Sequence, residues 1–73
     1  MIEKIPFLHR GTTYNIIIKE DISFEALHYL LDYLKEKGAF DSEEGVVDKY
    51  MIEHCAQKYT LCVDMSDVFI VVE

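Results

Sequence analysis

The residue types that most often bind metal ions or act as nucleophiles are few and scattered along this chain. His54 and Cys55 are adjacent, Cys62 follows seven residues later, and His9 and His28 lie far away in the sequence. No Cys-x-x-Cys or His-x-x-x-His pair occurs, although such spacings are typical of zinc sites. The sequence therefore predicts no metal site, and both cysteines are interpreted as small core residues.

Motifs for catalysis and nucleotide binding are also missing from the sequence. Cys, His and Asp are present as residue types, but any chain of this composition contains them by chance. The three glycines lie far apart, so neither a Gly-x-Gly-x-x-Gly loop nor a Gly-Lys-Ser/Thr sequence occurs. The acidic stretch 41–48 lacks the ligand order of a calcium loop. We expect no enzyme activity, no catalytic residue and no cofactor.

The functional signal of the sequence is the uneven distribution of its acidic residues. Fourteen acidic and seven basic residues give the 73-residue chain a net charge of −7. Residues 1–40 have a balance of −1, whereas residues 41–73 have a balance of −6. Phosphate contacts need a basic stripe, so nucleic acid and anionic membranes are poor partners. A basic protein fits better, and acidity that serves only solubility is the alternative.

The charged residues are positioned by secondary structure, and the sequence predicts one β-hairpin at each end of the chain. Strands are predicted over residues 2–9, 12–19, 59–63 and 68–72. Gly11 allows the tight first turn, and Pro6, which has no N–H to donate, confines the first strand to a sheet edge. The last strand is apolar on both faces and is therefore expected inside the sheet.

Two helices are predicted between the hairpins. Ser23 is a suitable N-cap for a helix over 24–37, and Gly38 ends it. Its apolar stripe recurs at helical spacing and consists of Phe24, Leu27, Leu31 and Leu34, widened by Leu30. Ser42 is the expected cap of a second helix that runs to about residue 58, with a stripe of Val47, Tyr50, Met51, His54 and Cys55.

The element order ββααββ predicts an α+β fold, in which a four-stranded antiparallel sheet made of the two hairpins has both helices on one face. Residues 1–73 form a single domain, which at this size buries only about 60% of the surface of its unfolded chain. The strand over 12–19, at Ile16–Ile18, is also apolar on both faces, and two such strands in so small a chain predict a homodimer that shares a sheet edge or a helix face.

The apolar runs and the cysteines also predict a location. The longest apolar run, residues 68–72, is too short to span a membrane. The first residues do not read as a secretory signal. Two cysteines cannot form a disulfide scaffold, so reduced thiols in the cytoplasm are expected.

Two sets of side chains are candidates for binding a partner. Glu44 and Asp48 lie four residues apart on the second predicted helix, where like charges repel, and a patch of one sign favours a function. Tyr29 and Tyr33 lie one turn apart on the first helix and offer apolar area with a polar tip; edges of the core are the alternative interpretation. The full set is Tyr29, Tyr33, Asp32, Glu36, Asp41, Glu43, Glu44, Asp48 and Glu53.

In size and charge the chain resembles the small acidic inhibitors that bacteriophages make against host proteins. In one class of these, carboxylates imitate DNA phosphates and occupy a nucleic-acid-binding groove. The segment 41–48 carries the resemblance, with Asp32, Glu36 and Glu53 as neighbours.

The resemblance implies a non-enzymatic inhibitor in the host cell cytoplasm that covers the basic surface of a DNA-binding protein, such as a nucleoid protein or a defence complex. The alternative is a small regulatory or adaptor domain that binds a protein partner through Tyr and Leu surfaces.

Overall fold

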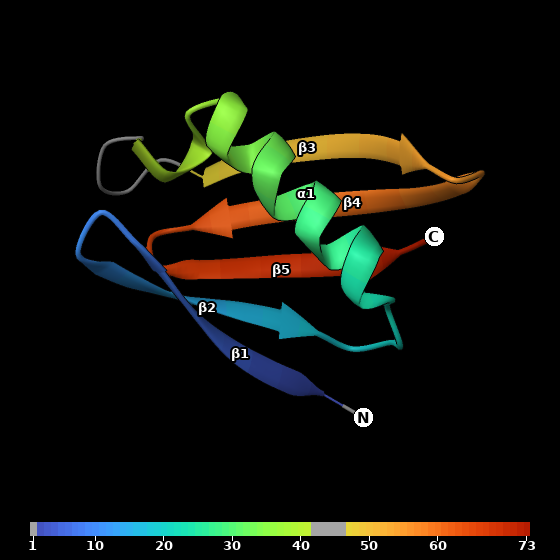
Figure 1. The fold of residues 1–73 in the computed structure, drawn as a ribbon, viewed down its shortest axis with the longest axis horizontal. Coiled ribbons are helices and arrows are strands. Elements are labelled where there is room, and N and C mark those ends of the chain that lie inside the picture. The colour runs from blue at the N-terminus through green and yellow to red at the C-terminus, as the bar shows by residue number, and fades with distance from the viewer. Residues whose placement is uncertain (1, 42–46) are drawn as a thin grey trace.

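The computed structural model describes residues 2–41 and 47–73, which form a helix packed on one mixed sheet (Figure 1). The elements in chain order are β1 (Glu3–His9), β2 (Thr12–Ile18), α1 (Phe24–Glu36), the 3-10 turn η1 (Ala39–Asp41), β3 (Val47–His54), β4 (Gln57–Asp64) and β5 (Asp67–Val72). The five strands lie in the order β1-β2-β5-β4-β3. Strand β2 is parallel to β5, and the other neighbours are antiparallel.

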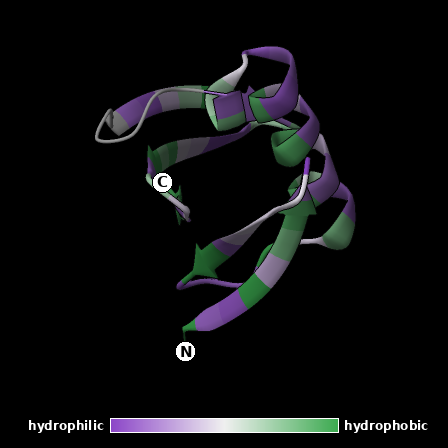
Figure 2. Cartoon of the chain, turned by 90° about the vertical axis from the view of Figure 1, so that its left-hand side faces the viewer, coloured by the Kyte–Doolittle hydropathy of each residue, from purple (hydrophilic) through white to green (hydrophobic). Residues whose placement is uncertain are grey.

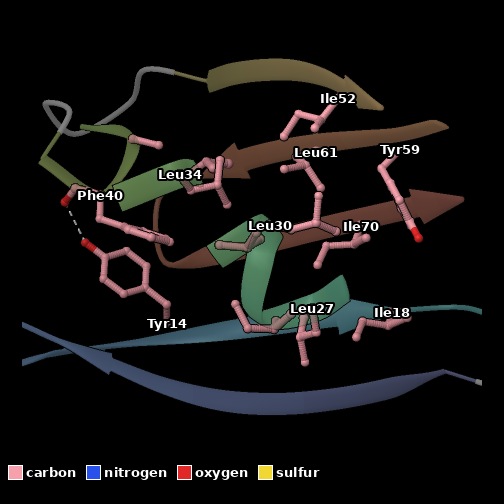
Figure 3. Close-up of a cluster of buried hydrophobic side chains, with 14 of the residues drawn as sticks. Tyr14, Ile18, Leu27, Leu30, Leu34, Phe40, Ile52, Tyr59, Leu61 and Ile70 are labelled. Atoms are coloured by element: carbon pink, nitrogen blue, oxygen red, sulfur yellow. Dashed lines mark hydrogen bonds between the residues drawn. The ribbon is translucent and has the colours of Figure 1, made fainter. Parts of the chain in front are cut away.

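The hydrophobic core lies between α1 and one face of the sheet, and Figure 3 shows its side chains. Helix α1 crosses in front of β5 and β4, from the end of β2 toward the start of β3 (Figure 1). Its buried residues are Ala26, Leu27, Leu30 and Leu34. They meet alternate residues of the strands, which point to the same face, chiefly Ile16, Ile18, Leu61, Val63, Val68 and Ile70.

Phe40 closes the core where the chain leaves α1. Its ring lies 4.7 Å from that of Tyr14, 5.5 Å from that of Phe7 and 5.3 Å from that of His9. The buried hydroxyl of Tyr14 donates a hydrogen bond of 2.8 Å to the carbonyl of Phe40 (Figure 3). The N-terminal hairpin is thereby tied to the end of the helix.

The opposite face of the sheet has no other described element over it, since α1 lies on one side only (Figure 2). Ile17 and Phe69 are paired neighbours on this open face and are half-buried. Val71 is 45% exposed and Met51 is 74% exposed. One helix therefore covers one face, and apolar side chains remain in contact with water on the other.

Several local predictions are confirmed. The first hairpin forms, β1 with Pro6 is an edge strand, and β5 lies inside the sheet. The Ser23 hydroxyl accepts a hydrogen bond of 3.1 Å from the N–H of Ala26, as an N-cap does. Gly38, which follows α1, has a φ of +71°, a conformation that glycine adopts without strain.

The predicted four-stranded antiparallel sheet with two helices is wrong, because residues 47–54 form β3 and the sheet is mixed. The helical stripe placed Met51 inside and left Ile52 outside. In the strand the reverse holds: Ile52 is 8% exposed and Met51 is 74% exposed. Tyr50 and Ile52 alternate with Lys49, Met51 and Glu53, and this period of two fits a strand as well as the helical spacing fits a helix.

The β3–β4 turn explains why the strand was missed. Cys55 and Ala56 are its two central residues, with φ values of 51° and 63°. Two-residue hairpin turns of this kind strongly prefer Asn-Gly or Asp-Gly. Cys-Ala carries no such signal.

No helix in the part of the chain that the structure describes is long and apolar enough to cross a membrane.

The β3–β4 turn yields a prediction whose sign separates a strand from a helix over residues 47–54. Replacing Cys55-Ala56 with Asn-Gly should raise the free energy of unfolding by about 1 kcal/mol, because both positions have positive φ. In a helix, Ala56→Gly alone would cost about 1 kcal/mol. Urea unfolding of the parent and the variant measures the difference, and a loss of stability would contradict the hairpin.

Candidate functional site

A shallow apolar groove lies on the outer side of α1, and we call it the α1 groove. Its lining residues are Phe24, Glu25, His28, Tyr29, Asp32 and His54. Phe24 is the first residue of α1 and is 86% exposed. The Tyr29 ring stacks on that of His54, with 4.1 Å between centroids and 20° between planes. The last residue of β3 therefore closes the groove on the sheet side.

Two carboxylates lie on either side of Tyr29 along α1 and line the α1 groove. Glu25 and Asp32 are seven residues apart on α1, which places them about 10 Å apart along the helix axis and nearly on one line. Asp32 lies 3.9 Å from both Lys35 Nζ and His28 Nε2. Exposed pairs of this kind contribute little and exchange readily with other partners. The groove thus offers the Tyr29 ring between two negative charges, with Phe24 beyond Glu25 at one end.

The two candidate tyrosines have different surroundings. Tyr29 is 43% exposed and belongs to the α1 groove. Tyr33 is half-buried and meets Tyr50 edge-on, with 6.1 Å between ring centroids. The Lys37 ammonium lies 5.5 Å from the Tyr33 ring centroid. Tyr33 therefore packs between α1 and β3, and Tyr29 is the tyrosine available to a partner.

The candidate acids do not share one surface. Asp32 and Glu36 are exposed on α1 and Asp41 lies in η1, whereas Asp48 and Glu53 point to opposite faces of β3 because their positions differ by an odd number. Glu43 and Glu44 lie outside the described residues. The spacing of four residues between Glu44 and Asp48 does not place two carboxylates on one helical face, because Asp48 lies in strand β3.

Some of these acids already have cationic neighbours. Asp41 Oδ1 lies 3.2 Å from Arg10 Nη1, which donates a hydrogen bond to it, and 3.9 Å from His9 Nε2. Glu53 is opposite Lys58 in the β3–β4 register. The charge excess of the C-terminal half is therefore less concentrated in space than in sequence.

The side chains of His54 and Cys55 lie closer together than the sequence implied. The Cys55 sulfur lies 3.5 Å from His54 Nε2. Both cysteines are free; Cys62 is half-buried, whereas Cys55 is exposed, so its assignment to the core is wrong. Among residues 2–41 and 47–73, no group of three His, Cys, Asp or Glu side chains is arranged to hold a metal ion.

Sequence reasoning missed Phe24 and His54 as groove residues and placed both on buried stripes. At about 100° per residue, Phe24 lies roughly 100° from the centre of the face formed by Ala26, Leu27, Leu30 and Leu34. A helical wheel centred on these four residues would have found Phe24 at the rim. His54 reaches the groove only because residues 47–54 form a strand.

No protein-family model matches the chain, and neither a curated protein nor a solved structure shows significant similarity to it.

The Tyr33–Tyr50 contact beside the groove yields a prediction about alkaline stability. Burial raises the pKa of Tyr50 above its ordinary value of 10.0, and the Asp48 carboxylate and Tyr33 add to the rise. The unfolded chain ionises this phenol first, so its contribution to stability is full below about pH 10 and is lost as the pH rises toward the folded pKa. Tyr50→Phe should flatten this loss, and Asp48→Asn should reduce it in part.

Urea unfolding at a series of pH values from neutral to alkaline measures this effect. The parent should lose stability more steeply than Tyr50→Phe above pH 10. If the free energy of unfolding depends on pH identically in the parent and in Tyr50→Phe, the raised pKa of Tyr50 is contradicted.

Proposed function

We propose that this protein is a non-enzymatic binding domain whose α1 groove takes up an extended segment of a protein partner, with one large apolar side chain between two basic ones. The observation that carries the proposal is that the exposed Phe24 and the stacked Tyr29–His54 pair line one groove together with the carboxylates of Glu25 and Asp32. Large aromatic side chains of this kind are the usual anchors of protein interfaces.

The charges support a basic partner. Carboxylates about 10 Å apart along α1 match basic residues three positions apart in a polyproline II segment, which has three residues per turn and rises about 3.1 Å per residue, so that both basic side chains lie on one face. The net charge of −7 favours encounter with a basic chain and speeds association. The groove corresponds to the adaptor interpretation of the sequence, with one change: Leu27, Leu30 and Leu34 are buried, so the surface consists of aromatic residues.

A cytoplasmic location is part of the proposal. Both cysteines are free, and a reducing compartment maintains this state.

A peptide-library experiment tests the groove. The probe is a set of labelled peptides with two Lys or Arg residues three positions apart and one Leu, Phe or Trp between them. Phe24→Ala or Tyr29→Ala should weaken binding of the best peptide about tenfold or more, because each variant removes an aromatic anchor. Glu25→Gln combined with Asp32→Asn should mainly slow association and reduce its dependence on salt.

Leu8→Ala is the matched control. Leu8 is 68% exposed on β1 and does not line the groove, so its truncation should leave peptide binding unchanged. Equal binding by the parent, Phe24→Ala and Tyr29→Ala would overturn the proposal.

DNA mimicry is the second candidate function, and the balance of −6 over residues 41–73 favours it. A mimic should displace duplex DNA from a basic DNA-binding protein, and neutralising Glu43, Glu44 and Asp48 together should weaken this displacement about tenfold. The α1 groove variants should then have no effect. If Phe24→Ala abolishes binding while the triple variant does not, the groove is the site and mimicry is wrong.

A further inference from the structure

The sheet has two edges, and they differ in their ability to add another strand. The β1 edge contains Pro6, which cannot donate a ladder hydrogen bond and is typical of protected edges. The β3 edge is eight residues long and contains neither Pro nor Gly. In Figure 1, β3 is the outermost strand at the top of the sheet. Its backbone groups on that side have no neighbouring strand among the described residues.

The residues of β3 are complementary to themselves when a second copy runs antiparallel to the first. A two-fold axis at Met51 places Lys49 opposite Glu53 of the partner subunit. It also places Asp48 opposite His54 of the partner subunit and Tyr50 opposite Ile52 of the partner subunit. Every charged side chain of the strand therefore faces one of opposite or complementary character, and the exposed Met51 meets its own copy.

From this complementarity we propose that the protein forms a homodimer by antiparallel pairing of β3 with β3 of a second copy, about a two-fold axis at Met51. The sheet then continues across both subunits. In antiparallel sheets, the backbone groups of alternate residues point to one neighbour and those of the intervening residues to the other. When the two-fold axis passes through a residue, odd-numbered residues lie opposite odd-numbered ones and even-numbered residues opposite even-numbered ones. The residues whose backbone groups point away from β4 therefore face each other in the two strands.

The charges select this register over its neighbours. An axis at Tyr50 places Lys49 opposite Met51 of the partner subunit and Asp48 opposite Ile52 of the partner subunit. An axis at Ile52 places Lys49 opposite the partner's Cys55, beyond the end of the strand. Only the axis at Met51 pairs both charged residues of the open face, Lys49 and Glu53, with each other.

Each subunit also contributes to the other subunit's α1 groove. His54 lines the groove, and the dimer places Asp48 of the partner subunit opposite it. The two His54 residues would lie about 20 Å apart along the strands, because six residues at about 3.4 Å separate them in this register. Two acidic grooves on one face, related by the two-fold axis, suit a partner with two basic segments.

Charge exchange tests the register. The parent should sediment as a dimer, and Lys49→Glu or Glu53→Lys alone should raise the dissociation constant of the dimer about tenfold or more, since each variant creates two like-charge pairs. An equimolar mixture of the two variants should form a heterodimer, because the Glu residues of one chain then face the Lys residues of the other. The double variant should form a homodimer again.

Lys4→Glu is the matched control, because it makes the same change of charge on the β1 edge. It should leave the dimer unchanged. A parent that sediments only as the 8.5 kDa species at hundreds of micromolar would overturn the proposal. A mixture of Lys49→Glu and Glu53→Lys that stays monomeric would also overturn it. Peptide binding by monomeric Lys49→Glu is measured separately, so failure of the dimer and failure of the groove are distinguished.

Disulfide trapping gives an independent readout. In a background of Cys55→Ser and Cys62→Ser, Met51→Cys should form a crosslinked dimer under mild oxidation, because a residue on the axis faces its own copy at a Cα distance that a disulfide spans. Thr60→Cys, opposite Met51 on the interior strand β4, should not crosslink. Crosslinking of Thr60→Cys but not Met51→Cys would place the contact on the open face and overturn edge pairing.

Discussion

Ile16 and Ile18 of β2 lie beside Val68 and Ile70 of β5, and this parallel pairing joins the first hairpin to the last three strands. All four side chains are almost fully buried. Because parallel neighbours need a crossover, the chain between them has to cross the sheet. Helix α1 provides that crossing, and β3 and β4 fold back so that β5 fills the place beside β2 (Figure 1). The place of α1, the strand order and the position of β3 at an edge follow from this contact.

The same constraint determines which surfaces stay exposed. A helix of 13 residues covers one face of a five-stranded sheet and leaves the other open. Its outer side has nothing above it among the described residues, so Phe24 and Tyr29 remain available to a partner. The crossover also carries the chain to the far edge, which makes β3 the outermost strand. A chain this small has too little material to cover these surfaces itself.

Local signals made the first hairpin, α1 and the last two strands predictable, and long-range contacts decided β3 and the strand order. Ser23, Gly38 and Pro6 each act within a few residues, and their predicted roles are confirmed. Residues 47–54 satisfy both a helical and a strand pattern, and the choice depends on β4, which pairs along the whole segment. In the candidate site, Tyr29 and Asp32 were found because they are exposed on a well-predicted helix. His54 could not be found, because its contact with Tyr29 requires β3.

Because β3 is an edge strand, its charged residues affect which other strands can pair with it. Charged residues on edge strands usually oppose pairing with other chains, because most registers leave a charge against an apolar or like-charged neighbour. Lys49 and Glu53 have this effect toward an arbitrary strand. They are also placed symmetrically about Met51, so an antiparallel copy of β3 satisfies both charges. Specificity depends on the difference in binding free energy between the right and the wrong partner. The side chains of Lys49 and Glu53 make pairing with an antiparallel copy of β3 more favourable and pairing with other strands less favourable.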